Sequence, residues 1–144
     1  MAAALTLARE AAAAGEIPVG CVVTDASGRV IGRGRNRREE GMDATAHAEI
    51  EAIREACRAR GTWRLDGCAI YVTLEPCPMC TGAIINARIP TVVYGAREAK
   101  SGSCGSVIDL FFENYGFQPR VYGGVLQEEC AAVLKEFFAA MRDK

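Results

Sequence analysis

The sequence predicts a three-layer α/β domain in which one mixed sheet lies between helices. In the first half, two apolar segments flank a short polar turn, which is typical of a β-hairpin. Beyond residue 45, segments with helical periodicity alternate with short segments rich in β-branched residues. Because helices connect the later strands, those strands should run parallel to one another.

The first elements are a helix and the hairpin. Residues 2–14 are rich in alanine and are followed by Gly15, which predicts a helix that ends there. Residues 17–24 (IPVGCVVT) and 29–36 (RVIGRGRN) are the predicted strands, and DASG at 25–28 is their turn.

The second half supplies three helices and two strands. In order, we expect a helix over 46–60, a strand over 68–74, a helix over 78–88, a strand over 91–95 and a terminal helix over 127–144. The terminal helix should pack against the sheet through residues that recur at helical spacing, namely Val133, Leu134, Phe137 and Phe138.

Length and composition fit one domain spanning residues 1–144. Half of the residues are hydrophobic (50%), 24% are charged, and the formal net charge is −1. A nearly neutral chain lacks the electrostatic footprint of a basic nucleic-acid-binding domain, so any RNA contact must be local. No apolar run reaches the roughly 18 residues of a membrane span, and the opening segment lacks a basic start. We therefore expect a cytoplasmic protein with no membrane partner.

Basic residues are densest at the end of the second predicted strand. Arg33, Arg35, Arg37 and Arg38 are followed at once by Glu39 and Glu40. Two interpretations stand side by side: a solvated hairpin edge with flanking acids, or a local RNA contact.

Seven cysteines, an odd number, do not suggest a disulfide framework. Only Cys77 and Cys80 form a recognisable pair, which in a reducing compartment is more often metal-binding or catalytic than structural. We expect the other five to be small buried hydrophobes: Cys21, Cys57, Cys68, Cys104 and Cys130.

The residues best suited to chemistry are His47, Cys77 and Cys80, with Glu49 close by. One imidazole and two thiolates suit zinc, and no fourth ligand stands at a usual spacing. Three protein ligands and one open position form the catalytic arrangement, in which the metal lowers the pKa of a bound water to about 7. Glu49 could then move the proton from that water to a substrate.

The spacing of His47 and Glu49 restricts their geometry. Two residues apart in mid-helix, they would project about 200° apart around the axis and could not share a site. At a helix start both can face a metal beyond the end of the axis, so we expect His47 in the first turn. Pro78 suits the first position of a second helix, which places Cys77 and Cys80 at its start. Two helix N-termini should therefore point at one metal ion.

Each motif has another interpretation when taken alone. A lone histidine is usually a core or surface residue, and C-x-x-C between a strand and a helix also describes a thioredoxin-like redox centre. The redox interpretation leaves His47 and Glu49 without a role. The zinc interpretation uses all four residues, and we favour it for that reason.

The order H-x-E (His47 to Glu49) and P-C-x-x-C (Pro76 to Cys80) is the known signature of zinc-dependent base deaminases. Longer segments resemble bacterial tRNA-specific adenosine deaminases over nearly the whole chain: IPVGCVV, Asn36-Arg37, DATAHAEIEAI, YVTLEPCPMCTGAI, GAREAKSGSCGS and GVLQEECAAVLKEFF. The resemblance implies a cytidine deaminase-like α/β/α fold with a mixed five-stranded sheet, one zinc ion per chain and a homodimer. It also implies a tRNA anticodon stem-loop as partner, with the wobble adenosine converted to inosine.

By the same resemblance, attack at C6 of adenine would be assisted by Glu49, which protonates N1, and ammonia would leave. The residues implied to contact the substrate are Asn36, Ile17, Ala48, Leu74, Lys100 and Phe138. Ile17 and Phe138 would look the same as plain core residues, and Lys100 could simply be solvated.

The sequence departs from the family pattern at Phe117-Gln118-Pro119, where Asn-His usually precedes the last strand. That change leaves the metal ligands and Glu49 intact. Two alternatives to tRNA deamination share the motif: a deaminase of free guanine, cytosine or nucleosides, and a zinc or redox module without turnover.

Overall fold

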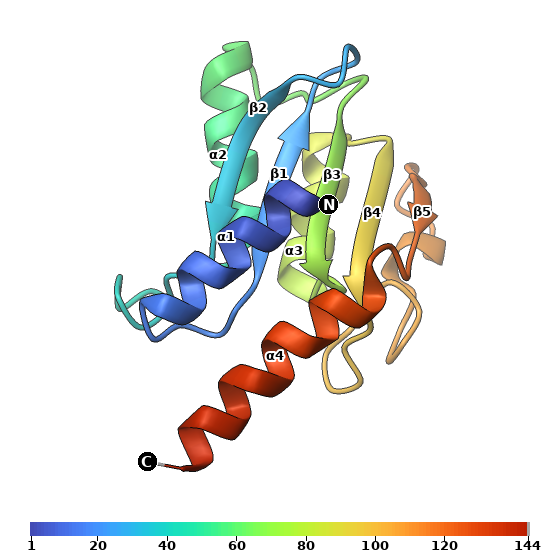
Figure 1. The fold of residues 1–144 in the computed structure, drawn as a ribbon. Coiled ribbons are helices and arrows are strands. Elements are labelled where there is room, and N and C mark those ends of the chain that lie inside the picture. Colours follow the sequence, from blue (N-terminus) through green and yellow to red (C-terminus); the bar gives the residue numbers. More distant parts are fainter. Residues whose placement is uncertain (144) are drawn as a thin grey trace.

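The computed structural model describes residues 1–143 and shows a five-stranded sheet with helices on both faces (Figure 1). The strands are β1 (Gly20–Thr24), β2 (Val30–Arg35), β3 (Ala69–Leu74), β4 (Thr91–Ala96) and β5 (Arg120–Tyr122). The helices are α1 (Ala2–Ala13), α2 (Ala48–Arg60), α3 (Pro78–Ala87) and α4 (Gln127–Arg142), with a single 3-10 turn, η1 (Leu110–Phe112). The predicted three-layer α/β/α architecture with a mixed five-stranded sheet is confirmed.

The sheet has the strand order β2-β1-β3-β4-β5 and changes direction in its middle. Strand β1 runs antiparallel to both β2 and β3, whereas β3, β4 and β5 run parallel. Helix α3 connects β3 to β4, which is why those two strands can be neighbours and parallel. The prediction of parallel later strands is therefore confirmed.

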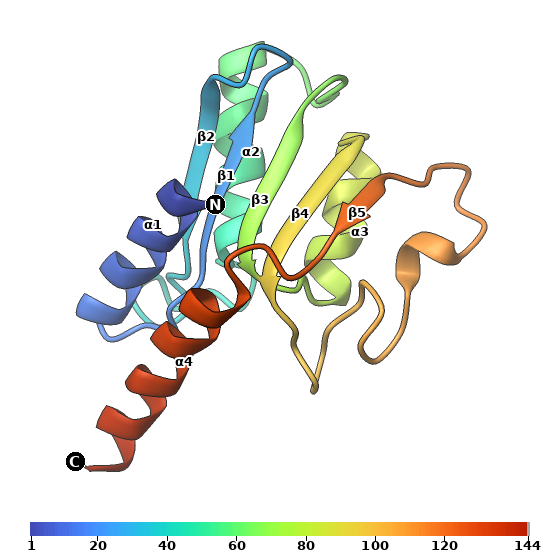
Figure 2. The ribbon, with the colours of Figure 1, turned by 45° about the vertical axis from the view of Figure 1, so that its right-hand side comes forward.

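Helices α2 and α3 cover one face of the sheet, and α1 and α4 lie on the other (Figures 1 and 2). Glycines in the hairpin allow two of these helices to approach closely. A Cβ at Gly34 would collide with the backbone of Ala48 and Ala52 in α2, and one at Gly20 would collide with Ala4 and Ala8 in α1. The absence of a side chain at these strand positions thus sets the distance between layers.

The main core lies between the sheet and the layer formed by α2 and α3. Four of the five scattered cysteines are buried as predicted, and Cys57 is half-buried. The predicted packing of the terminal helix is only partly correct, because Val133 is buried whereas Phe138 is 45% exposed. The C-terminal half of α4 extends past the end of the sheet and has no strand beneath it (Figure 1).

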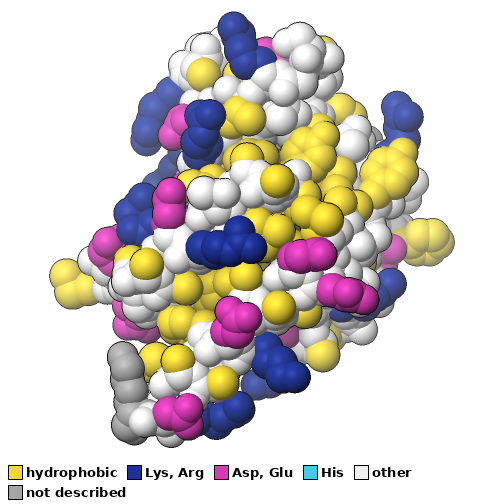
Figure 3. Space-filling model, in the orientation of Figure 1, with side chains coloured by type: hydrophobic (Ala, Val, Ile, Leu, Met, Phe, Trp, Pro, Cys, Tyr) yellow, Lys and Arg dark blue, Asp and Glu magenta, His cyan; other side chains and the backbone are white. Residues whose placement is uncertain are grey.

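Several predicted boundaries shift by one to three residues. The first strand begins at Gly20, not at residue 17, because the chain turns sharply before it, with the Val19 amide bonded to the Ile17 carbonyl at 2.9 Å. Strand β5 is short, and all three of its residues are exposed. Apolar side chains are visible on the face of the molecule that Figure 3 shows. The last residue of the predicted terminal helix, residue 144, lies outside the described residues. In residues 1–143, no helix has the length and apolar character that crossing a membrane requires.

Candidate active site

Three potential metal ligands meet where α2 and α3 begin. His47 Nδ1 lies 3.6 Å from Cys77 Sγ and 3.5 Å from Cys80 Sγ. The ligand atoms of all three residues lie within 4.8 Å of one another, a spacing that allows a single cation to contact each of them. One nitrogen and two sulfurs form a donor set that suits a borderline or soft divalent cation.

Both helices present their N-termini to this cluster, as the spacing predicted. His47 is the N-cap of α2, one position before the first turn, and Cys77 is the N-cap of α3. Both residues have extended backbones, and neither makes a side-chain capping bond. Pro78 occupies the start of α3, which places Cys80 in the first turn of that helix. The unpaired N–H groups of two helix ends therefore favour negative charge at this point.

The two thiols differ in acidity because they contact each other. The hydrogen bond from Cys80 lowers the pKa of Cys77 to about 4, against the opposing effect of burial. The same hydrogen bond raises the pKa of Cys80, as does its burial. Cys77 is therefore the more acidic thiol of the pair.

Glu49 lies in the first turn of α2 and is almost completely buried, with 4% of its surface exposed. Burial disfavours the charged carboxylate and raises the pKa of Glu49 to about 7. It lines a cavity of about 160 Å³ together with His47 and Cys77. The full lining is Ile17, Val19, Asn36, Arg38, His47, Ala48, Glu49, Leu74, Glu75, Cys77, Glu98 and Ser101.

Four of the six predicted substrate-contact residues line this cavity: Ile17, Asn36, Ala48 and Leu74. Asn36 is held in place, because its side-chain nitrogen donates to the Ile17 carbonyl at 3.4 Å and its oxygen accepts from the Arg38 amide at 3.1 Å. The structure does not bring the other two into the lining. Lys100 is exposed next to the lining residue Ser101, and Phe138 is exposed on α4.

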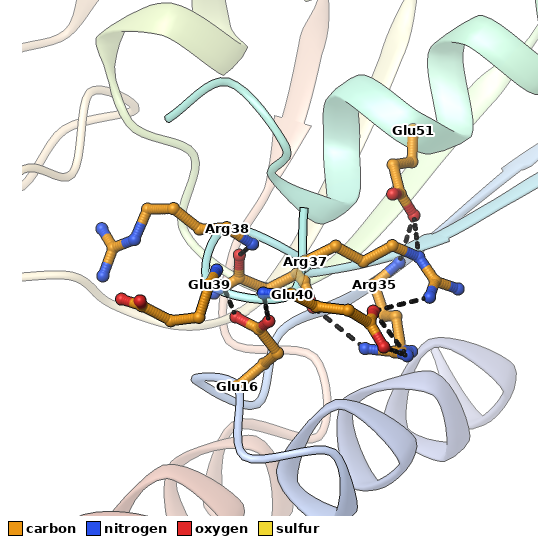
Figure 4. Close-up of polar contacts among 8 residues, drawn as sticks. Glu16, Arg35, Arg37, Arg38, Glu39, Glu40 and Glu51 are labelled. Atoms are coloured by element: carbon orange, nitrogen blue, oxygen red, sulfur yellow. Dashed lines mark hydrogen bonds and ion pairs between the residues drawn. The ribbon is translucent and has the colours of Figure 1, made fainter. Parts of the chain in front are cut away.

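Two buried glutamates hold the segments that form opposite walls of the cavity. Glu16 accepts hydrogen bonds from the amides of Glu39, at 3.1 Å, and Glu40, at 2.6 Å (Figure 4). It thereby fixes residues 36–43, the segment after β2 that carries Asn36, which we call the Glu16 wall.

Glu75 holds residues 97–108, the segment after β4, which we call the Glu75 wall. Its carboxylate accepts hydrogen bonds from the amides of Cys104 at 3.0 Å, Ser106 at 3.1 Å and Glu98 at 3.2 Å, and also from the Ser106 hydroxyl. Burial alone would raise the pKa of Glu75, but these hydrogen bonds outweigh burial and lower it.

Sequence reasoning missed both anchors and also the cavity residues Val19, Glu98 and Ser101, whereas Arg38 was named only as part of a possible RNA contact. One signal was available for Glu75. It stands between the end of a buried strand and Pro76, at a place where an isolated acid cannot face water and must find donors. Glu16 is also an acid next to an apolar segment, since it stands between Gly15 and Ile17, but this signal is weaker.

The sequence profile of the cytidine and deoxycytidylate deaminase zinc-binding region matches residues 1–96. The chain belongs to the cytidine and deoxycytidylate deaminase family. Within this family it is 45% identical to a tRNA-specific adenosine deaminase of Bacillus subtilis, over 100% of this chain and 89% of that protein. It is also 49% identical to a tRNA(Ile)-lysidine synthase of Deinococcus radiodurans, over 99% of this chain. The match spans about a quarter (24%) of that relative's length.

Solved deaminases share the fold. A structure from work on A-to-I editing by tRNA:A34 deaminases at the wobble position of transfer RNA matches with a TM-score of 0.87 and 46% identity, over 91% of this chain and 95% of that one. A guanine deaminase from Nitrosomonas europaea matches with a TM-score of 0.78 and 29% identity, over 96% of this chain and 82% of that one. The predicted resemblance to tRNA-specific adenosine deaminases is thus confirmed.

Proposed function

We propose that this chain is a zinc-dependent deaminase that converts adenosine to inosine at the wobble position of a tRNA anticodon loop. One observation carries the chemistry: His47, Cys77 and Cys80 converge at the end of a cavity into which Glu49 and Asn36 also project. The tRNA substrate is supported by the similarity to tRNA-specific adenosine deaminases over the full length of the chain.

The donor set fits zinc, with His47, Cys77 and Cys80 as ligands. A zinc ion held there would supply a water that attacks at neutral pH. Glu49 is not needed as a ligand, and it lies beside the cluster in the same cavity. We assign to its carboxylate the transfer of a proton from the attacking water to N1 of the base, with ammonia as the leaving group.

The remaining cavity residues would hold the base. Ile17, Ala48 and Leu74 supply apolar surface, and the Asn36 amide supplies a donor and an acceptor. A cavity of about 150 Å³ holds benzene, so the 160 Å³ present here suits one flipped base and not a stacked pair. Lys100 stands at the rim and could contact RNA outside the cavity. A substrate contact of Phe138 stays a prediction, because this residue lies outside the cavity.

We also propose that the chain acts as a homodimer in the cytoplasm. Exposed apolar side chains gather in the segment before and around η1, at Val107, Ile108, Phe112 and Tyr115. Large apolar side chains exposed close together in one segment are a feature of protein interfaces. Sedimentation equilibrium of the purified chain tests this, and a monomeric mass at micromolar concentration would contradict it.

A second candidate is a deaminase of free guanine, favoured by the match to the Nitrosomonas europaea enzyme. The test is to incubate the zinc-loaded chain with an anticodon stem-loop, free guanine and free adenosine, then measure inosine and ammonia. Our proposal requires inosine in the stem-loop. Ammonia from free guanine alone would instead establish the second candidate.

The role of Glu49 is tested in the same assay. Glu49→Ala should lower the rate by about 10²- to 10⁴-fold, because general acid–base catalysis contributes that much, and bound zinc should stay at one ion per chain. Glu10→Ala, which removes an exposed acid on α1, is the control and should leave both values unchanged. Loss of zinc from Glu49→Ala would show that Glu49 is a ligand.

A further inference from the structure

A basic groove runs along the edge of the sheet next to the catalytic cavity. It has a volume of about 360 Å³ and lies between α1 and α2, over the edge strand β2. Its charged lining consists of five arginines and two glutamates: Arg33, Arg35, Arg37, Arg54, Arg58, Glu51 and Glu55. In Figure 3, basic side chains gather along this edge of the molecule.

Two of the five arginines build the wall of the groove. Arg35 pairs with Glu40 at 3.1 Å, and Arg37 pairs with both Glu40, at 2.9 Å, and Glu51, at 3.0 Å (Figure 4). These pairs connect the Glu16 wall of the cavity to helix α2. Their charges are already neutralised, so Arg35 and Arg37 give the groove its shape more than its charge.

The other three arginines have no such partner. Arg33, Arg54 and Arg58 are exposed, and within residues 1–143 their side chains make no ion pair or hydrogen bond. Arg54 and Arg58 are four residues apart on α2, where like charges repel and slightly destabilise the helix. Glu51 is already paired with Arg37, and within residues 1–143 the other groove carboxylate, Glu55, forms no ion pair with these three arginines. The groove therefore keeps an excess of positive charge, and its guanidinium groups are suited to bind phosphate in the bidentate manner of arginine.

The groove and the cavity lie on opposite sides of residues 35–38, because successive side chains of this segment point to alternate sides. Asn36 and Arg38 line the cavity, whereas Arg35 and Arg37 line the groove. In Figure 4 the Arg38 side chain extends away from those of Arg35 and Arg37. At about 1.5 Å per residue, Arg54 and Arg58 lie about 10 and about 16 Å along the axis of α2 from His47. An RNA whose base enters the cavity and whose backbone crosses this segment would therefore place more distant phosphates in the groove.

We infer that this groove binds the phosphate backbone of the RNA stem next to the target loop, through Arg33, Arg54 and Arg58. This inference rests on the proposed function and adds a second contact site to it. Phosphate contacts carry no sequence information but fix the register of the RNA, so the groove would position the stem while the cavity selects the base.

The test compares two triple variants with the same change in charge. R33Q/R54Q/R58Q removes the unpaired groove arginines, and R64Q/R120Q/K135Q removes three exposed basic residues outside the groove. Deamination is measured on an anticodon stem-loop and on its loop nucleotides alone. Binding of the stem-loop is measured by fluorescence anisotropy at several salt concentrations. Each protein in this measurement also carries Glu49→Ala, so that the RNA is not deaminated while it binds.

The groove variant should raise KM for the stem-loop by at least about tenfold, leave kcat unchanged and leave KM for the loop nucleotides unchanged. Each lost phosphate contact should also reduce the slope of log K against log[salt] by about 0.7 to 0.9, so three contacts amount to about 2 to 3. Equal effects of the control variant would overturn the groove assignment. If the wild-type chain bound the stem-loop through the groove but deaminated neither RNA, the RNA-binding role of the groove would stand and the proposed function would be refuted.

Discussion

The two walls of the cavity are held in place by the same kind of residue but by different surroundings. Glu16 fixes its wall through two backbone amides, and the ion pairs of Arg35 and Arg37 with Glu40 add to this. Glu75 fixes its wall through three amides and one hydroxyl. Among the described residues, the Glu75 wall contains no ion pair.

This difference predicts different sensitivities. The ion pairs of the Glu16 wall are partly exposed, since 46% of the Glu40 side chain is accessible, and salt screens such pairs. Glu75 is buried, with 2% of its surface exposed, so salt affects its hydrogen bonds little and the loss of an acceptor costs more. We therefore expect the Glu16 wall to change its stability with salt concentration and to tolerate substitution, and the Glu75 wall to do neither.

The largest effect should follow from Glu75→Gln. The new amide group replaces one acceptor oxygen with a donor that faces N–H groups, and unsatisfied buried donors cost about 1–3 kcal/mol each. We expect the free energy of unfolding to fall by about 2–3 kcal/mol in urea denaturation. Glu16→Gln, the matched variant, should lower it by about 1–2 kcal/mol because fewer donors are affected. A larger loss for Glu16→Gln would reverse the comparison.

A smaller effect should come from a methyl group on each wall. Gly102→Ala places a Cβ against the Glu75 carboxylate and the Glu98 carbonyl, and such overpacking costs about 1–3 kcal/mol. Gly41→Ala meets only the Arg37 carbonyl, at 3.1 Å, and the Asp43 Cβ, at 3.8 Å. Its unfolding free energy should stay within about 0.5 kcal/mol of the wild type. Equal losses in thermal or urea unfolding would show that both walls are equally rigid.

The smallest effect should appear on acidification. The pKa values of Glu75 and Glu40 are both lowered in the fold, the latter chiefly by the hydrogen bond from Arg37. A lowered carboxyl pKa stabilises the fold above the pKa of the unfolded chain, and this stabilisation disappears as pH falls through the folded value. Urea unfolding between roughly pH 6 and pH 3 should therefore show a gentler loss for Glu75→Gln than for the wild type.

High salt separates the two contributions. On acidification, Glu40→Gln should also lose less stability than the wild type, and high salt should abolish this difference because the ion pairs of Glu40 are partly exposed. The difference between Glu75→Gln and the wild type should persist in high salt. If salt removed both differences, the claim that Glu75 is protected from solvent would be wrong.

The candidate metal cluster could be predicted from sequence because each of its members stands at a locally marked position and because the three residue types together form one donor set. His47, Cys77 and Cys80 each stand at a helix start, and proline and spacing rules define such positions within a few residues. The sheet could be predicted for a similar reason, since helices that connect strands determine which strands are parallel.

The anchors and the terminal helix could not be predicted in this way. Glu16 and Glu75 bind amides 23 to 31 residues away, and no local pattern marks such partners. Phe138 has the periodicity of a buried residue, but the helix extends past the sheet that would cover it. Periodicity shows which face of a helix is apolar and leaves open how far the partner surface extends.

The close approach of α2 to the hairpin at Gly34 couples the geometry of the catalytic residues to the position of the groove arginines. A methyl group there would push α2 outward, and with it His47 and Glu49 would move relative to Cys77. The same shift would carry Arg54 away from Arg33 on β2. Few substitutions should be tolerated at this contact, because any change at Gly34 that increased the affinity for RNA would also misalign the catalytic residues. Changes in substrate preference should accumulate instead at exposed arginines and in the wall segments, which can be exchanged without moving the helix.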